Sequence, residues 1–382
     1  MPFRPAFTWP TLLFTILLLT AFGCVDDDMP GGTGMVGCLD CPPDEIAGTF
    51  APTSVTLEVP NYFPQLPAGA SEGLTEEGIA LGRRLFYDPI LSSDSTFSCQ
   101  SCHLQELAFT DGTARSLGVR GLEGKRSAMS LANLAFNVNG FFWDGRAGTL
   151  ERQAVHPVED MLELNEDWDN VLAKIRRHAT YPEAFKAAFG TPLRSEIDRD
   201  QVTQALAQFE RTLLSTSSRF DSVVQLNQGF FTEQEERGRE LFFLEFALPN
   251  MIHPGCSHCH NQPLFGDNQF KNNGLDNVSS LADFTDGGRG EATGNVFDNG
   301  KFRTPTLRNI ALTAPYMHDG RFATLEEVID HYASGGHGVE HEDPNIAGFE
   351  ISAEDRAAMV AFLRTLTDQN FISNSAFYDP EN

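Results

Sequence analysis

The stretch FSCQSCHLQELAFTDG, residues 97–112, decides how the rest of this chain is interpreted. It holds two cysteines separated by two residues and followed directly by a histidine: Cys99, Cys102 and His103. Such a triplet occurs in zinc knuckles, in thiol redox switches, beside structural disulfides and where haem is bonded to a chain. The triplet alone leaves these alternatives open, so the remainder of the sequence has to separate them.

The same triplet returns as Cys256, Cys259 and His260, and its surroundings return with it. Residues 74–89, LTEEGIALGRRLFYDP, precede the first triplet, and the similar residues 231–243, FTEQEERGRELFF, precede the second. A motif repeated together with its flanking sequence indicates a duplicated structural unit.

Both flanking segments are typical of helices. Thr75 and Thr232 are the expected N-caps, and Glu235 completes a capping box with Thr232. Each half also closes on a capped amphipathic segment, over residues 197–215 and 351–368, with apolar residues at helical spacing. The sequence therefore predicts an all-α fold made of two helical domains related by internal duplication.

Covalent haem explains two such loops better than zinc or a redox thiol pair. In c-type attachment two thiols bond the porphyrin while the adjacent imidazole ligates the iron. Structural zinc needs four tetrahedral ligands, which two adjacent Cys–His pairs would supply awkwardly. No βαβ pattern of the thioredoxin kind surrounds either motif. We therefore expect two covalently bound c-type haems.

The composition is that of an ordinary globular protein, and its charge restricts the choice of partners. The chain has 382 residues, 41% of them hydrophobic, and a formal net charge of −26. This length allows two domains with separate cores. Phosphate backbones would be repelled over most of the surface, which argues against a nucleic-acid binder.

The first residues predict export. An apolar run over 11–22 is too short to span a bilayer and lies where the h-region of a signal peptide lies. We expect a signal peptide over 1–23, of the lipoprotein type, with a lipid anchor at Cys24. Residues 24–59 are rich in acidic residues, Gly and Pro and suggest a flexible linker, in which Cys38 and Cys41 would form a small local disulfide.

Beyond the haem loops, three further stretches resemble the bacterial di-haem cytochrome c peroxidases and their MauG-type relatives. They are AFTDG (108–112), GFFWDGRAGTLERQA (140–154) and GKFRTPTLRNIALTAPYMHDGRFATLEEVIDHY (300–332). The resemblance implies two cytochrome c-like domains: an N-terminal peroxidatic domain over 60–225 and a C-terminal electron-transfer domain over 226–382.

The resemblance also assigns roles to residues around the first haem. It makes His103 the ligand of the peroxidatic haem iron and His260 that of the electron-transfer haem iron. Gln153 and Glu163 match the distal glutamine and glutamate of the family. Glu163 would move a proton between the peroxide oxygens, and Gln153 would donate a hydrogen bond. Glu159 is the local competitor, but the spacing from Gln153 favours Glu163.

Between the haems, the resemblance makes Trp143 a relay for electrons. Arg146 and Arg321 are candidates to pair with haem propionates, because arginine binds carboxylates in a bidentate manner. Both arginines are equally compatible with solvated surface charges.

Two departures from the family pattern concern the iron ligands. No histidine lies between His103 and His156, and Val119 stands near the position where many relatives carry a blocking histidine. We therefore expect an open first haem that needs no reductive activation. At the second haem, the position of the usual methionine ligand is occupied by Tyr332, as in MauG-type enzymes, with Met317 and His331 as rivals.

The resemblance further implies a calcium ion between the domains. Thr313 and Pro315 match its backbone ligands, and Ser127 stands where the family has an asparagine. Oxygen donors of this kind suit calcium.

Together these features predict a peroxidase that reduces hydrogen peroxide to water. Its electrons would come from a small donor protein such as a cytochrome c or a cupredoxin, through the second haem. The alternatives are MauG-like oxidation of residues in a partner protein and a non-catalytic electron-transfer cytochrome. We expect a periplasmic location, attachment to the cell envelope through Cys24 alone, and a homodimer as in many relatives.

Overall fold

Threonine caps begin both of the helices that precede the C-x-x-C-H loops, as the sequence predicts. In the computed structural model, Thr75 accepts a hydrogen bond from the Gly78 amide at the start of α1 (Glu76–Tyr87). Thr232 and Glu235 form the expected capping box at the start of α6 (Glu233–Phe242). The structure describes residues 42–244 and 254–381. The expected signal peptide, Cys24 and the Cys38–Cys41 pair lie outside them.

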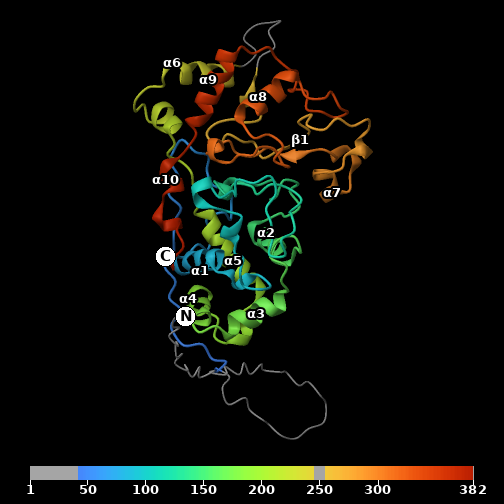
Figure 1. The fold of residues 1–382 in the computed structure, drawn as a ribbon. Helices are drawn as coiled ribbons and strands as arrows, with labels where there is room; N and C mark the ends of the chain where they lie inside the picture. The colour runs from blue at the N-terminus through green and yellow to red at the C-terminus, as the bar shows by residue number, and fades with distance from the viewer. Residues whose placement is uncertain (1–41, 245–253, 382) are drawn as a thin grey trace, which may run out of the picture. The chain divides into compact units, whose positions relative to one another are not determined.

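The described residues are mostly helical, and the predicted closing helices are confirmed as α5 and α9 (Figure 1). One small antiparallel ribbon, in which Phe270 pairs with Arg303, departs from a purely helical fold. The remaining elements have these bounds: α2 Leu150–Glu159, α3 Trp168–Arg177, α4 Tyr181–Phe189, α5 Arg199–Arg211, β1 Phe270–Lys271, α7 Arg289–Thr293, β2 Phe302–Arg303, α8 Leu325–Ser334, α9 Ala353–Arg364 and α10 Gln369–Ile372. Among the described helices, none combines the length and the apolar character that crossing a bilayer requires.

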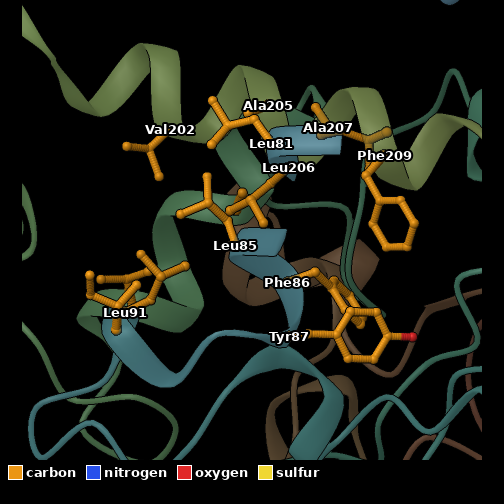
Figure 2. Packing of buried hydrophobic residues seen from close by; sticks show 14 of the residues in the cluster. Leu81, Leu85, Phe86, Tyr87, Leu91, Val202, Ala205, Leu206, Ala207 and Phe209 are labelled. Atoms are coloured by element: carbon orange, nitrogen blue, oxygen red, sulfur yellow. The ribbon is translucent and has the colours of Figure 1, made fainter. Parts of the chain in front are cut away.

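The residues from Asp44 onward form one contact unit that contains two hydrophobic clusters. Side chains of α1, α2, α3, α4 and α5 build the first cluster, and side chains of α6, α8 and α9 build the second. In Figure 2, Leu81, Leu85 and Phe86 of α1 lie against residues of α5 such as Leu206 and Phe209. The domain boundary near residue 225 stays a prediction.

Two segments join the first cluster from distant parts of the sequence. Ile46 is buried in it, and its amide donates to the Pro192 carbonyl at 2.9 Å, so part of the expected linker is packed. Phe371 and Phe377, near the end of the chain, also belong to the first cluster. The Tyr87 hydroxyl donates to the Phe377 carbonyl at 2.6 Å, which ties α1 to the last residues.

The two pairs of packed helices, α1 with α5 and α6 with α9, cross in the same manner. A Cβ atom at Gly82 would overlap the Ala205 carbonyl, and one at Gly238 would overlap the Ala358 carbonyl. Beside each crossing, two aromatic rings are in contact. The ring centroids of Phe86 and Phe209 are 5.3 Å apart. The corresponding rings of α6 and α9 are 5.1 Å apart. The helices approach this closely because a glycine lies at each crossing.

We predict that Gly82→Ala destabilises the protein, because the new methyl group would push α1 away from the backbone of α5. The expected loss is about 1–3 kcal/mol of unfolding free energy, more than alanine gains through helix propensity. Thermal and urea unfolding of the holoprotein would measure it. Gly148→Ala is the matched control, since a Cβ there meets nothing within 4 Å. Equal stability of the two variants would contradict the close-packing argument.

Candidate functional site: two C-x-x-C-H loops and a carboxyl group of raised pKa

The two C-x-x-C-H loops have the same local structure. Each begins with a short 3-10 turn, Cys99–Ser101 in the first and Cys256–His258 in the second. The His103 amide donates to the Cys99 carbonyl at 3.0 Å, and the corresponding bond in the second loop is 2.9 Å. All four cysteines are free thiols, as attachment to a porphyrin requires.

Both histidine rings are oriented by the same kind of hydrogen bond. His103 Nδ1 lies 2.7 Å from the Phe109 carbonyl, and His260 Nδ1 lies 3.1 Å from the Phe265 carbonyl. A carbonyl can only accept, so Nδ1 carries the proton and Nε2 keeps a free lone pair for a metal. Burial lowers the pKa of both imidazoles, which favours the neutral form that ligates iron.

The rival zinc interpretation lacks a site. Within residues 42–244 and 254–381, no three His, Cys, Asp or Glu side chains converge to hold a metal ion. The two loops therefore do not combine into one tetrahedral centre. Two thiols and one available imidazole nitrogen in each loop fit a covalently attached haem.

A cavity of about 280 Å³ lies against the second loop, as a haem bonded there requires. Cys256, Cys259 and His260 form part of its wall, and Tyr332 and Met317 line it as well. Tyr332 therefore lies near both thiols of the second loop, which share the cavity wall with it. Burial raises the pKa of Tyr332 to about 12.

Asn273, which the sequence did not single out, lies between the three candidate ligands. Its side chain donates to Met317 Sδ at 3.5 Å, and it lowers the pKa of the nearby Tyr332 against the larger effect of burial. The Asn273 backbone carbonyl lies 2.9 Å from His331 Nε2. This hydrogen bond uses the ring nitrogen through which His331 would have to ligate iron. Tyr332 and Met317 thus remain as candidates, and this geometry disfavours His331.

On the side of the first loop, Glu163 is held in a tight turn after α2. Its amide donates to the Asp160 carbonyl at 3.0 Å, and its carbonyl accepts from the Val119 amide at 2.8 Å. Burial, and to a smaller degree the charge of Glu163, raises the pKa of the Cys99 and Cys102 thiols, so this carboxyl group lies near the first loop. Burial, assisted by Asp160, raises the pKa of Glu163 to about 7.

Gln153 lies on α2, one turn after the Thr149 cap, and is partly exposed. No hydrogen bond among the described residues joins it to Glu163, which lies in the turn after the same helix. Glu159, the competitor, is the exposed last residue of α2. Glu163 is therefore the carboxylate with the altered environment.

Trp143 and the proposed calcium ligands lie around the cavity of the second loop. Trp143 Nε1 donates to the Ser127 carbonyl at 3.0 Å, and Ser127 Oγ donates to the Met317 carbonyl at 3.0 Å. Thr313 and Pro315 line the same cavity. The polar groups of Ser127 are thus already engaged within the protein, and the calcium ion stays a prediction.

A second buried carboxylate, Glu210 at the end of α5, also escaped the sequence analysis. Its side chain is 7% exposed, and its Oε2 atom has no hydrogen-bond partner. Burial raises the pKa of Glu210 to about 8, and the carboxylate interacts electrostatically with Cys99. In the sequence it looked like an ordinary polar residue of an amphipathic helix.

Comparisons with known proteins agree with this geometry. A family model described as di-haem cytochrome c peroxidase matches residues 76–229. The methylamine utilization protein MauG of Methylorubrum extorquens is 35% identical over 79% of this chain and 81% of its own. The cytochrome c551 peroxidase of Nitrosomonas europaea is 34% identical over 75% and 79%. A solved MauG-like protein associated with microbial copper homeostasis is 35% identical, with a TM-score of 0.77 over 86% of this chain and 100% of that chain.

We predict that Glu210→Gln stabilises the protein at alkaline pH. The folded-state pKa of about 8 lies above the ordinary value of 4.5, so the native chain keeps a proton that the unfolded chain releases. As pH rises from 4.5 to about 8, Glu210 therefore lowers the free energy of unfolding by a growing amount. The variant should gain on the order of 2–4 kcal/mol over wild type at pH 9 and little at pH 4.

Urea unfolding of the holoprotein at several pH values measures this difference. The exposed Glu350 provides the control through Glu350→Gln, which should follow the wild-type curve at every pH. If the free energies of unfolding of wild type and Glu210→Gln change in parallel with pH, the buried carboxyl group of Glu210 does not titrate between pH 4 and pH 9.

Proposed function

Because this chain belongs to the di-haem cytochrome c peroxidase family, we propose that it reduces hydrogen peroxide to water with electrons from a small donor protein. The reaction consumes two electrons and two protons and yields two water molecules. The donor would be a cytochrome c or a cupredoxin. The observation that carries the proposal is Glu163, a carboxyl group whose pKa is raised to about 7 by burial and whose backbone is fixed by hydrogen bonds to Asp160 and Val119 near the first C-x-x-C-H loop.

Two c-type haems, which the family implies, would supply the iron that accepts peroxide and the redox equivalents. The chain's part is to hold them. The thiols of each loop would bond the porphyrin, and the Nδ1 hydrogen bonds described above would present the Nε2 atoms of His103 and His260 to the iron.

Glu163 would act as the proton carrier of the reaction. Its carboxylate would take a proton from one oxygen of hydrogen peroxide and deliver it to the other oxygen, which leaves as water. A pKa near 7 suits a group that must both accept and release a proton at neutral pH. Gln153 would orient the peroxide through its amide N–H.

Access to the first site would be open in the resting enzyme. The loop that could block it carries Val119, whose amide bonds the Glu163 carbonyl at 2.8 Å. A valine side chain cannot ligate iron, so we propose that peroxide reacts without prior reduction of the second haem.

Electrons would reach the first site from the second haem past Trp143, which lines the cavity of the second loop. We propose Tyr332 as the far-side ligand of the second haem. An anionic phenolate stabilises the ferric state, which favours the second candidate function, MauG-like oxidation of residues in a partner protein. A purely electron-transferring cytochrome would not need the altered carboxyl group of Glu163.

The matching helix crossings support two domains related by duplication, peroxidatic over 60–225 and electron-transferring over 226–382. We further propose export to the periplasm with an anchor at Cys24, a homodimer, and a calcium ion held by carbonyl oxygens near Thr313 and Pro315.

Glu163→Gln should lower the rate of the reaction with peroxide by about 10²–10⁴-fold, because the amide cannot carry the proton. In wild type the rate should rise as pH passes through about 7, where the carboxyl group ionises, and the variant should lose this dependence. Stopped-flow absorption at several pH values measures both effects. Glu159→Gln is the neighbouring control. Unchanged rates in Glu163→Gln, with both haems present, would remove Glu163 from the mechanism.

Tyr332→Phe should abolish a phenolate-to-iron charge-transfer band and raise the midpoint potential of the second haem, because an anionic ligand is lost. Absorption spectra and a spectroelectrochemical titration measure these changes. Met317→Leu, on the same cavity wall, should leave both as in wild type. The opposite pattern would identify Met317 as the ligand.

A further inference from the structure

Two arginines, Arg303 and Arg308, are buried in the described part of the chain, and the side chain of a third, Arg126, is 8% exposed; Arg303 differs from the other two in its partners. Arg308 is 1% exposed and pairs in a bidentate manner with Asp221, at 2.8 Å for both contacts. The Arg126 side chain pairs with Asp144 at 2.6 Å and with Asp286 at 2.7 Å. Arg303, at 5% exposure, forms no ion pair with any carboxylate of residues 42–244 or 254–381.

The Arg303 guanidinium contacts only neutral acceptors. Nε donates to the Phe142 carbonyl at 3.1 Å, Nη1 to Asn268 Oδ1 at 2.8 Å, and Nη2 to Met129 Sδ at 3.3 Å. A guanidinium has five N–H donors, and a thioether is a weak acceptor. Burial without a compensating charge lowers the pKa of Arg303 to about 10. Such an uncompensated cation is costly unless an anion completes its surroundings.

The position of Arg303 indicates where the anion would come from. It lies on β2 and lines the cavity beside the second C-x-x-C-H loop. Two residues later, Pro305 lines the same cavity as His260. The other cationic side chain of the cavity wall, Lys271, already has Asp267 at 3.3 Å and Asp343 at 3.7 Å. Of these two cationic side chains in the cavity wall, Arg303 is therefore the one that forms no ion pair with an acidic residue of the described chain.

The two arginines that the sequence suggested for haem propionates already have acidic partners within the protein. Arg146 pairs with Asp144 at 3.1 Å, and its guanidinium lies 3.5 Å from the centre of the Phe142 ring. Arg321 pairs with Asp276 and Asp319, both at 2.6 Å. A haem carboxylate would have to compete with these acids, whereas at Arg303 it would not.

We propose that Arg303 binds a propionate carboxylate of the haem attached at Cys259 and Cys256, and so positions the edge of that haem against the backbone of Trp143. The proposal rests on the haem content that the proposed function assumes. Arg303 already holds this backbone through two hydrogen bonds. Its amide donates to the Trp143 carbonyl at 2.7 Å, and its side-chain Nε donates to the carbonyl of Phe142, the residue before Trp143. One side chain would thus fix the haem edge and the relay residue together.

Removing this charge should change the redox behaviour of the second haem. A cation near the haem edge favours the reduced, less positive iron, so its loss stabilises the ferric form. Arg303→Gln should therefore move the midpoint potential of the second haem to more negative values and shift that of the first haem less. Arg303→Lys keeps the charge, and its midpoint potential should remain close to that of wild type.

Spectroelectrochemical titration of the full-length holoenzyme, with the haems distinguished by their EPR signals, makes the test. The exposed Arg237, paired with Asp355 on the surface of α6, gives the control Arg237→Gln, which should match wild type. An unchanged potential of the second haem in Arg303→Gln overturns the proposal. A larger shift at the first haem overturns the assignment to the second.

Haem content per chain and far-UV circular dichroism show whether the Arg303→Gln variant is intact. Should it fail to load haem, resonance Raman spectra of the Arg303→Lys holoenzyme replace the titration. A shifted propionate bending mode of the second haem then supports the contact, and a wild-type band overturns it. Neither readout uses peroxide, so a wild-type enzyme inert toward peroxide would refute the proposed function and leave this test intact.

Discussion

The hydrogen bond from histidine Nδ1 to a backbone carbonyl is the interaction around which both halves of the molecule are arranged. It joins His103 to Phe109 and His260 to Phe265, and it leaves the opposite ring nitrogen available. Both accepting residues adopt left-handed backbone conformations, with φ of 62° and 53°. Non-glycine residues rarely adopt such angles, so the surrounding packing must hold them there. The aromatic rings of Phe109 and Phe265 are fully buried and provide that packing.

Local features of the fold could be predicted from the sequence, because their causes are local. The Thr75 cap, the Thr232–Glu235 capping box and the helical spacing in α5 and α9 are all readable within a few residues. The two triplets were informative because they recur with their flanks. The β1–β2 ribbon was not predicted, since it pairs residues more than thirty positions apart and is only two residues long in each strand.

The candidate site was predictable only where a motif carried it. Glu163 differs from Glu159 through its environment, which is set by a loop some forty residues earlier in the chain. Arg303 and Asn273 have ordinary sequence neighbours, and their significance lies in partners from distant segments. A missing counter-charge cannot be read from a sequence, because it depends on which acids the fold brings near. The arginines singled out by motif proved to have acidic partners already.

The packing of Phe371 and Phe377 in the first hydrophobic cluster has a consequence for the independence of the two halves. Phe371 and Phe377 pack beside Phe109, whose carbonyl orients His103, and Gln105 donates to the Phe371 carbonyl at 3.1 Å. The first hydrophobic cluster therefore includes aromatic side chains from both halves of the described chain. A first half produced without residues 371–377 would leave the Phe109 ring without these two aromatic neighbours, so the two halves are not independent in packing.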